Sequence, residues 1–226
     1  MATLRGIDVG GSANLNFNMT ADIAKQVGFC IVKATEGATF KWESFQRIVN
    51  QCDSLGVPFG FYHYAKKNDA IKEADAFYET VSPYIGKGIP CLDWEKGQSV
   101  EWVNKFLARF YELAHVYPWV YGNAWRFEQG KVNGECDRWV ARYPVVITDL
   151  NADLSKWTNQ VDGLLACWQF SESIKLSGYS GTVDGNIFYG SKDQWRLYAE
   201  GDRTVVEQPA LITVEDENYR VDITRK

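Results

Sequence analysis

The sequence predicts an α/β protein built as a single β/α barrel with a shortened second half. Short runs rich in Val, Ile, Phe, Tyr and Trp alternate with helical patterns at a spacing of roughly 30 residues, which favours βα units and a parallel sheet. In the second half of the chain the strand-like runs continue, whereas convincing helical patterns do not. We expect about eight strands and about five helices, with an open doubly wound sheet as the alternative fold.

Eight runs are expected to form strands because β-branched and aromatic residues dominate them and Gly, Pro, Asn or Asp bound them. In chain order they are residues 4–10, 28–35, 57–64, 88–95, 118–122, 138–144, 164–170 and 181–188. The early runs are predicted to be connected by helices, and the late runs by loops or hairpins.

Four helical patterns lie between the early strands. Thr20, Asp69 and Ser99 each precede a run with apolar residues at helical spacing, and each is a candidate N-cap. A further pattern over 40–56 ends at Gly56, a plausible C-cap. Between 122 and 138 there is room for one short helix, whereas 144–164 is broken by turn residues.

The chain is expected to consist of one barrel over residues 1–196 and a different segment after it. The barrel region is short beside the ~250 residues of a typical eightfold barrel. Residues 197–226 are charged and contain alternating stretches at 204–206 and 211–214, so we expect a C-terminal extension, a linker or an extra hairpin.

Composition excludes several functions. The formal net charge of −5 and the lack of a Lys/Arg cluster along the 226 residues argue against nucleic-acid binding. No apolar run approaches the ~20 residues of a membrane helix, and the N-terminus has no apolar signal segment. Cys30, Cys91 and Cys167 lie in apolar runs, as expected for reduced core cysteines of a protein made in the cytosol. The cysteines and histidines show no zinc-ligand spacing, and no cofactor is expected.

Polar and aromatic side chains gather at the ends of the predicted strands, where a barrel has its active site. The same rim receives residues from almost every predicted strand. They are Asp8, Lys33, Glu36, His63, Tyr64, Asp93, Glu95, Tyr121, Trp168, Gln169 and Asp184.

The stretch Asp93-Trp94-Glu95 places two carboxylates at one strand end. Residues i and i+2 of a strand face the same side, and repulsion tends to keep a proton on one of the two acids. A protonated acid beside an ionised one suits glycosidic bond cleavage. Alternatively, the pair begins a solvated loop and contacts Lys96, or an acidic cluster binds Mg²⁺ or Ca²⁺.

Asp8 and Asp184 strengthen the catalytic interpretation, because the first and last strands are neighbours when a barrel closes. Trp168 is the better candidate for a sugar-stacking platform among the tryptophans. His63 is more often a hydrogen-bonded rim or core residue than a catalytic base.

The chain resembles the glycoside hydrolase family 25 muramidases, the lysozyme type found in phage endolysins and bacterial autolysins. The matching pieces occur in the family's order between residue 5 and about residue 190, and together they are highly specific. They are GIDVGG, FCIVKATEG, PFGFYHY, CLDWE, WVYGN, WVARYP, CWQFS and GTVDGN. The chain departs from the family's pattern at Gly10 and Gly11, where Ser or a similar residue often follows the first Asp, and at WQF in place of WQY.

The resemblance implies hydrolysis of the β-1,4 bond between N-acetylmuramic acid and N-acetylglucosamine. It assigns Glu95 as general acid/base and Asp93 as its partner, acting either on the substrate's N-acetyl group or directly on the sugar carbon. It places Asp8 and Asp184 among the acids of the groove. The predicted substrate contacts are Tyr62, Tyr121, Trp168, Gln169 and His63.

Two other functions stay open at this point: a non-catalytic carbohydrate-binding barrel, and a chitin-directed glycosidase. The expected partner is the glycan strand of peptidoglycan. We expect a monomer, made in the cytosol without a signal peptide, that acts at the bacterial cell wall after holin-assisted release.

Overall fold

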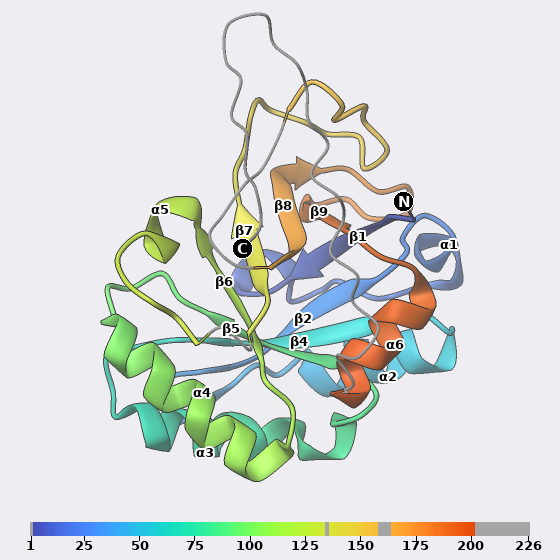
Figure 1. Ribbon diagram of the computed structural model, residues 1–226. Helices are drawn as coiled ribbons and strands as arrows, with labels where there is room; N and C mark the ends of the chain where they lie inside the picture. Colours follow the sequence, from blue (N-terminus) through green and yellow to red (C-terminus); the bar gives the residue numbers. More distant parts are fainter. Residues whose placement is uncertain (1, 134–135, 158–163, 202–226) are drawn as a thin grey trace, which may run out of the picture.

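A computed structural model describes residues 2–133, 136–157 and 164–201, which form a closed barrel (Figure 1). The described residues hold nine strands in one sheet, eight of which close the barrel. The strands are β1 (Leu4–Val9), β2 (Cys30–Glu36), β3 (Phe40–Lys41), β4 (Phe59–Tyr64), β5 (Ile89–Asp93), β6 (Trp119–Asn123), β7 (Arg138–Ala141), β8 (Leu165–Ile174) and β9 (Val183–Phe188).

The strand order confirms the predicted barrel and excludes the open doubly wound sheet. Strands follow one another as β1-β9-β8-β7-β6-β5-β4-β2, and β1 pairs with β2 to close the ring. Every pair from β1–β2 round to β7–β8 is parallel, whereas β9 is antiparallel to both of its neighbours. The shortened second half is therefore completed by a β8–β9 hairpin in place of a further βα unit.

The described part of the chain has six α-helices, one more than expected. They are α1 (Ala21–Ala24), α2 (Phe45–Ser54), α3 (Ala70–Val81), α4 (Val100–Ala114), α5 (Ala124–Phe127) and α6 (Lys192–Glu200), with short 3₁₀ turns at Ser12–Asn14 and Ser82–Tyr84. The predicted caps Thr20, Asp69 and Ser99 each accept hydrogen bonds from backbone N–H groups of the first turn.

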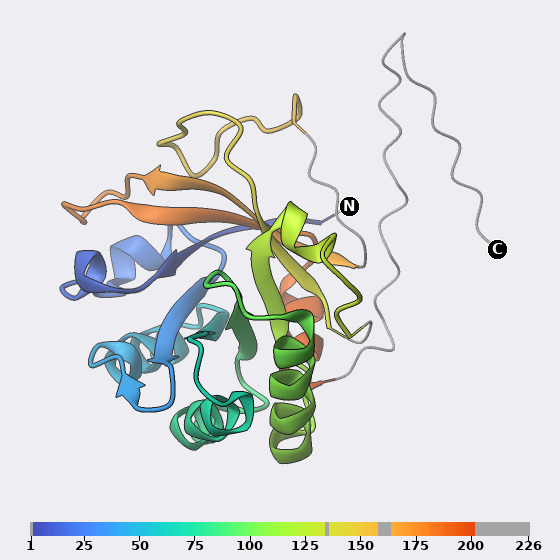
Figure 2. The ribbon, with the colours of Figure 1, turned by 90° about the vertical axis from the view of Figure 1, so that its left-hand side faces the viewer.

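The helices cover the barrel unevenly. Helices α2, α3 and α4 lie along the side formed by β2, β4 and β5, whereas the β7–β9 side carries loops (Figures 1 and 2). Buried residues form two layers, one between the barrel and these helices and one inside the barrel. The interior layer includes Phe29, Trp119, Trp139 and Phe188.

Helix α6, which the sequence pattern did not reveal, closes the barrel at the amino ends of the parallel strands. Its Trp195 belongs to the interior layer, with its ring centroid 4.5 Å from that of Phe29. The Trp195 indole N–H donates to the carbonyl of Phe59 at 3.1 Å. The helix runs through residue 196, so the folded unit continues past the expected boundary. Residues 202–226, with the alternating stretches at 204–206 and 211–214, lie outside the described residues.

Candidate active site

Two acids face each other where the first and last strands meet. Asp8 of β1 and Asp184 of β9 are directly opposite partners in the antiparallel pairing. Burial and, next in size, the neighbouring Asp8 together raise the pKa of Asp184 to about 9. Burial also raises the pKa of Asp8, to about 6, although hydrogen bonds from Asn186 and Gln169 oppose the rise. The two carboxyl groups thus retain protons well above the pH at which a solvated Asp ionises.

The Asp8 carboxylate is held by two buried amide groups. Its Oδ2 accepts from Asn186 Nδ2 at 2.7 Å and from Gln169 Nε2 at 2.8 Å. Asn186 is fixed in turn because its Oδ1 accepts from the indole N–H of Trp139 at 2.7 Å. Both amides lie deep in the barrel, so they hold Asp8 in one orientation.

Gln169 joins these acids to the tyrosines of the rim. Its Oε1 accepts from the hydroxyls of Tyr121, at 2.7 Å, and Tyr143, and its Nε2 reaches Asp184 Oδ2 at 3.3 Å as well as Asp8. With 2% of its surface exposed, Gln169 has no face left for a ligand. In this arrangement Gln169 orients the acids and tyrosines around it, and its contact with substrate stays a prediction.

The two acids of strand β5 occupy different surroundings. Asp93 ends the strand and is 7% exposed, whereas Glu95 lies two residues beyond and is exposed. Burial, and then the charge of Glu95, raises the pKa of Asp93 well above its usual value. Within the described part of the chain, Asp93 Oδ1 has no hydrogen-bond partner. A buried acid that keeps its proton thus sits beside an acid open to solvent.

The loop that carries Glu95 is anchored through its backbone and not through the carboxylate. Trp94 points away into the outer core, where its indole N–H donates to the Gln98 carbonyl at 2.9 Å. Arg126 donates to the Glu95 carbonyl oxygen, and its guanidinium lies 4.6 Å from the ring centroid of Trp125. This leaves the Glu95 side chain available to a ligand at a fixed place on the rim.

Tyr62 reaches the acids because Gly10 lacks a side chain. A Cβ atom at position 10 would lie 2.1 Å from the Tyr62 hydroxyl. Burial raises the pKa of Tyr62, and the nearby Asp93, Asp8, Asp184 and Glu95 raise it further. The Gly10 departure from the family pattern thus admits a tyrosine hydroxyl into the acid cluster.

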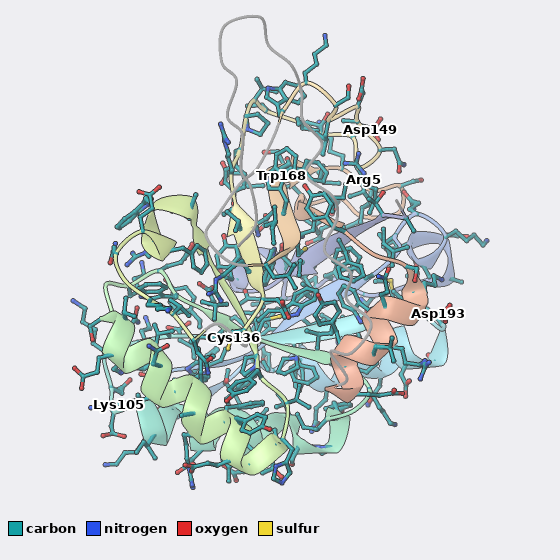
Figure 3. The ribbon with its side chains drawn as sticks, viewed as in Figure 1. Arg5, Lys105, Cys136, Asp149, Trp168 and Asp193 are labelled. Carbon is teal, nitrogen blue, oxygen red and sulfur yellow. The ribbon has the colours of Figure 1, made fainter. Side chains whose placement is uncertain are left out.

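His63 and Trp168, two of the predicted substrate contacts, lie on the outer face of their strands, away from the barrel interior. His63 is fully buried outside the barrel wall, between Thr35 Oγ1 at 2.8 Å and Glu73 Oε2 at 2.9 Å. Burial lowers its pKa. Trp168 is 2% exposed and donates its indole N–H to the Arg142 carbonyl at 2.8 Å, beside the loop after β7 (Figure 3). Both rings are buried, and their contacts with substrate stay predictions.

Three further residues of the site, Trp125, Tyr143 and Asn186, are not among the substrate contacts predicted from the sequence. Trp125 and Tyr143 are 51% and 43% exposed, and they follow β6 and β7 at the same end as Glu95. Asn186 lies two residues after Asp184 on β9, and Tyr143 lies two residues after the buried Ala141 that ends β7. The i, i+2 spacing that identified the carboxylate pair would also have identified Asn186 and Tyr143 in the sequence.

The described residues hold no group of three or more His, Cys, Asp or Glu side chains arranged to hold a metal ion. Within the same part of the chain, all the helices are too short or too polar to cross a bilayer.

Comparisons with known proteins show which family the chain belongs to. The family model for Glycosyl hydrolases family 25 matches residues 7–179. The chain is 27% identical over 196 residues to an autolytic lysozyme of Clostridium acetobutylicum, covering 82% of this chain and 56% of that protein. It is 27% identical over 213 residues to Lysozyme M1 of Streptomyces globisporus, covering 83% of this chain and 68% of that protein. The chain thus spans little more than half the length of the first of these relatives.

Solved structures share the fold. A bacterial lysozyme from Streptomyces coelicolor superposes with a TM-score of 0.70 at 23% identity, covering 88% of this chain and 98% of that one. The catalytic domain of endolysin ply40 from bacteriophage P40 of Listeria monocytogenes gives a TM-score of 0.67 at 20% identity, covering 88% and 98%. The family model covers most of the barrel, including Asp8, Asp93 and Glu95. This chain therefore belongs to glycosyl hydrolase family 25.

Proposed function

We propose that this chain is a peptidoglycan hydrolase that cleaves the β-1,4 bond between N-acetylmuramic acid and N-acetylglucosamine. The observation that carries the proposal is the pairing of a buried, proton-holding Asp93 with an exposed Glu95, at the rim that also holds Asp8 and Asp184. The relatives named autolytic lysozyme and endolysin support the choice of cell-wall glycan as substrate.

In the proposed mechanism Glu95 is the general acid/base, because it is the member of the pair that solvent and substrate reach. It donates a proton to the glycosidic oxygen as the bond to the sugar carbon breaks. Asp93 holds the proton of the pair while the site is empty and passes it to Glu95 when substrate binds, so that Glu95 has a proton to donate. Asp93, now ionised, orients the substrate's acetamido group, whose oxygen attacks the sugar carbon while the glycosidic oxygen leaves with the proton from Glu95. Water, deprotonated by Glu95, then opens the cyclic intermediate and completes the hydrolysis. Tyr62 and Tyr121 line the floor on which the sugar lies.

Glu95→Gln tests the proposal. An amide cannot donate a proton as a carboxylic acid does, so we expect the rate to fall by about 10²- to 10⁴-fold. The measurement is mass analysis of muropeptides released from purified cell walls, with new reducing ends expected at muramic acid. Glu112→Gln, at a side chain 64% exposed on α4, is the matched control and should keep full activity. Full activity in Glu95→Gln would overturn the assigned role.

Two alternatives are outcomes of the same assay. Saccharide binding without any release of reducing ends indicates a non-catalytic carbohydrate-binding barrel. Turnover of chitin oligomers in preference to peptidoglycan indicates a chitin-directed glycosidase.

The proposal extends to where and how the protein acts. The place of action is the bacterial cell wall, and the catalytic unit comprises residues 1–196 together with the rest of α6. We further propose synthesis in the cytosol, release through a holin pore, and action as a monomer. Lysis of expressing cells only when a holin is co-expressed, and the mass in solution by light scattering, test these parts.

A further inference from the structure

Four lysines that are scattered in the sequence come together at the rim beside Glu95. Three of them surround one aromatic ring: the ammonium nitrogens of Lys33, Lys66 and Lys96 lie 4.8, 5.3 and 5.8 Å from the ring centroid of Tyr64. Lys67 joins them, because its Nζ lies 3.8 Å from where a Cβ of Gly97 would be. We call Lys33, Lys66, Lys67 and Lys96 the lysine cluster.

The strand register explains why the cluster forms next to the acid pair. Tyr64 ends β4 and pairs with Glu36 of β2 on one side and with Asp93 of β5 on the other. The lysines therefore come from the ends of β2, β4 and β5, which are adjacent in the barrel but separate in the chain. Sequence composition gave no basic run and thus no sign of this surface.

The charges of the cluster are only partly neutralised. Glu36 binds two of the four ammonium groups, with Lys33 Nζ at 2.6 Å from its Oε2 and Lys66 Nζ at 2.7 Å from its Oε1. In the described ranges no carboxylate lies within ion-pair distance of Lys67 or Lys96. Both of these side chains are exposed. On a protein whose net charge is −5, this is a local excess of positive charge directed at solvent.

An apolar surface adjoins the cluster. Phe40 of the short strand β3 is 49% exposed, and Lys33 Nζ lies 5.7 Å from its ring centroid. An exposed phenylalanine and a tyrosine ring among ammonium groups suit a ligand that carries carboxylates on a backbone with small apolar groups.

We propose that the lysine cluster is a subsite for the peptide stem of peptidoglycan, binding the stem's carboxylates while Phe40 packs against its alanine methyl groups. The inference rests on the proposed function and deepens it. A glycan bound across Glu95 carries its stem on the lactyl group of muramic acid, close to the scissile bond. Lys67 and Lys96, which form no ion pair within the described part of the protein, supply the ammonium groups for the ligand. The Tyr64 side chain and, more weakly, the nearby Glu95 and Asp93 raise the pKa of Lys96, which keeps it charged. The subsite would make the enzyme prefer stem-bearing glycan over bare glycan.

The test compares variants on three forms of one glycan. Purified walls are first treated with hydrofluoric acid, which removes phosphodiester-linked polymers. One portion keeps its stems, the second has the stem carboxylates converted to amides, and the third has its stems removed by an amidase, which leaves the lactyl carboxylate. The variants are Lys67→Gln/Lys96→Gln and the control Lys25→Gln/Lys105→Gln, whose lysines are 76% and 61% exposed elsewhere.

On stem-bearing glycan we expect Lys67→Gln/Lys96→Gln to lose roughly tenfold in kcat/KM, mostly through KM, as expected for two solvent-exposed charge contacts. On the amidated and the stem-free glycan this variant should match wild type within about twofold. The control should match wild type on all three. Equal losses on all three substrates would overturn the subsite. An equal loss on the stem-free and the stem-bearing glycan would also overturn it, because the lysines would then bind the lactyl carboxylate. If wild type releases no reducing ends from any form, the proposed function itself fails.

Discussion

Gly10 and Tyr62 show how one missing side chain shapes the site. The Tyr62 hydroxyl occupies the place that a Cβ at position 10 would take, at 2.1 Å, and the Lys33 Cβ lies 2.9 Å from the same point. The phenol thus reaches the acids through a gap that only glycine leaves open. The phenol cannot move outward without giving up its place beside Asp8 and Asp93.

Gly10→Ala should therefore disturb the site and the fold together. Overpacking of this kind costs about 1–3 kcal/mol, and displacement of Tyr62 should raise KM. Urea denaturation and kinetics on cell walls measure the two effects.

The double variant Gly10→Ala/Tyr62→Phe provides the control. Because phenylalanine lacks the hydroxyl nearest the new methyl group, it should recover part of the lost free energy of unfolding. Identical stability of Gly10→Ala and wild type would show that the close approach is not rigid.

Helix α6 is the element on which the barrel interior depends. Its Trp195 is 2% exposed, contacts Phe29, Trp119 and Phe188 through its ring, and donates a hydrogen bond to the Phe59 carbonyl. The side chain fills the end of the barrel that is opposite to the acids.

Trp195→Ala should lower the free energy of unfolding by about 3–5 kcal/mol, since it opens a cavity in the interior layer and leaves a carbonyl without its donor. Equilibrium denaturation measures this. Trp125→Ala, at a ring that is 51% exposed, should change stability by no more than about 0.5 kcal/mol. A small effect at position 195 would mean that α6 is not needed to close the barrel.

The elements also show how far the sequence leads. All eight barrel strands were predictable because short apolar runs bounded by turn residues mark them, and the meeting of Asp8 with Asp184 follows from ring closure alone. The sequence did not show whether His63 and Trp168, or the residues next to them in their strands, face the barrel interior. Both faces of each strand are buried, so the apolar residues do not alternate with polar ones. The pairing between neighbouring strands settles the direction. Tyr64 and Tyr121 pair with Asp93, so their side chains lie on the same face of the sheet as the Asp93 carboxyl group.

The stability of the whole molecule should depend on pH through its buried acids. The pKa of Asp184 is raised from 3.8 to about 9, and that of Asp8 from 3.8 to about 6. Between about pH 4 and about pH 9, the folded protein therefore binds more protons at these acids than the unfolded chain does. The free energy of unfolding contributed by Asp184 is therefore largest below about pH 4 and falls as the pH rises toward about 9.

Asp184→Asn should flatten this dependence, because the variant has no proton to release at that position. The slope of the unfolding free energy between pH 5 and 8 should become less negative by up to about 1.4 kcal/mol per pH unit. Urea denaturation across this range measures it. Asp22→Asn, at a side chain 83% exposed, should keep the wild-type slope. An unchanged slope in Asp184→Asn would show that Asp184 ionises normally.

The hairpin that closes the barrel also contains the last strand of the barrel to be synthesised. Ile7 pairs with Cys30 on one side and with Gly185 on the other, so β1 keeps a bare edge until almost the whole barrel has been synthesised. Asp8 cannot meet Asp184 before that pairing forms. A ribosome-bound chain therefore keeps Asp8 apart from Asp184 through nearly all of translation, and a fragment cut short of β9 lacks this pair of acids.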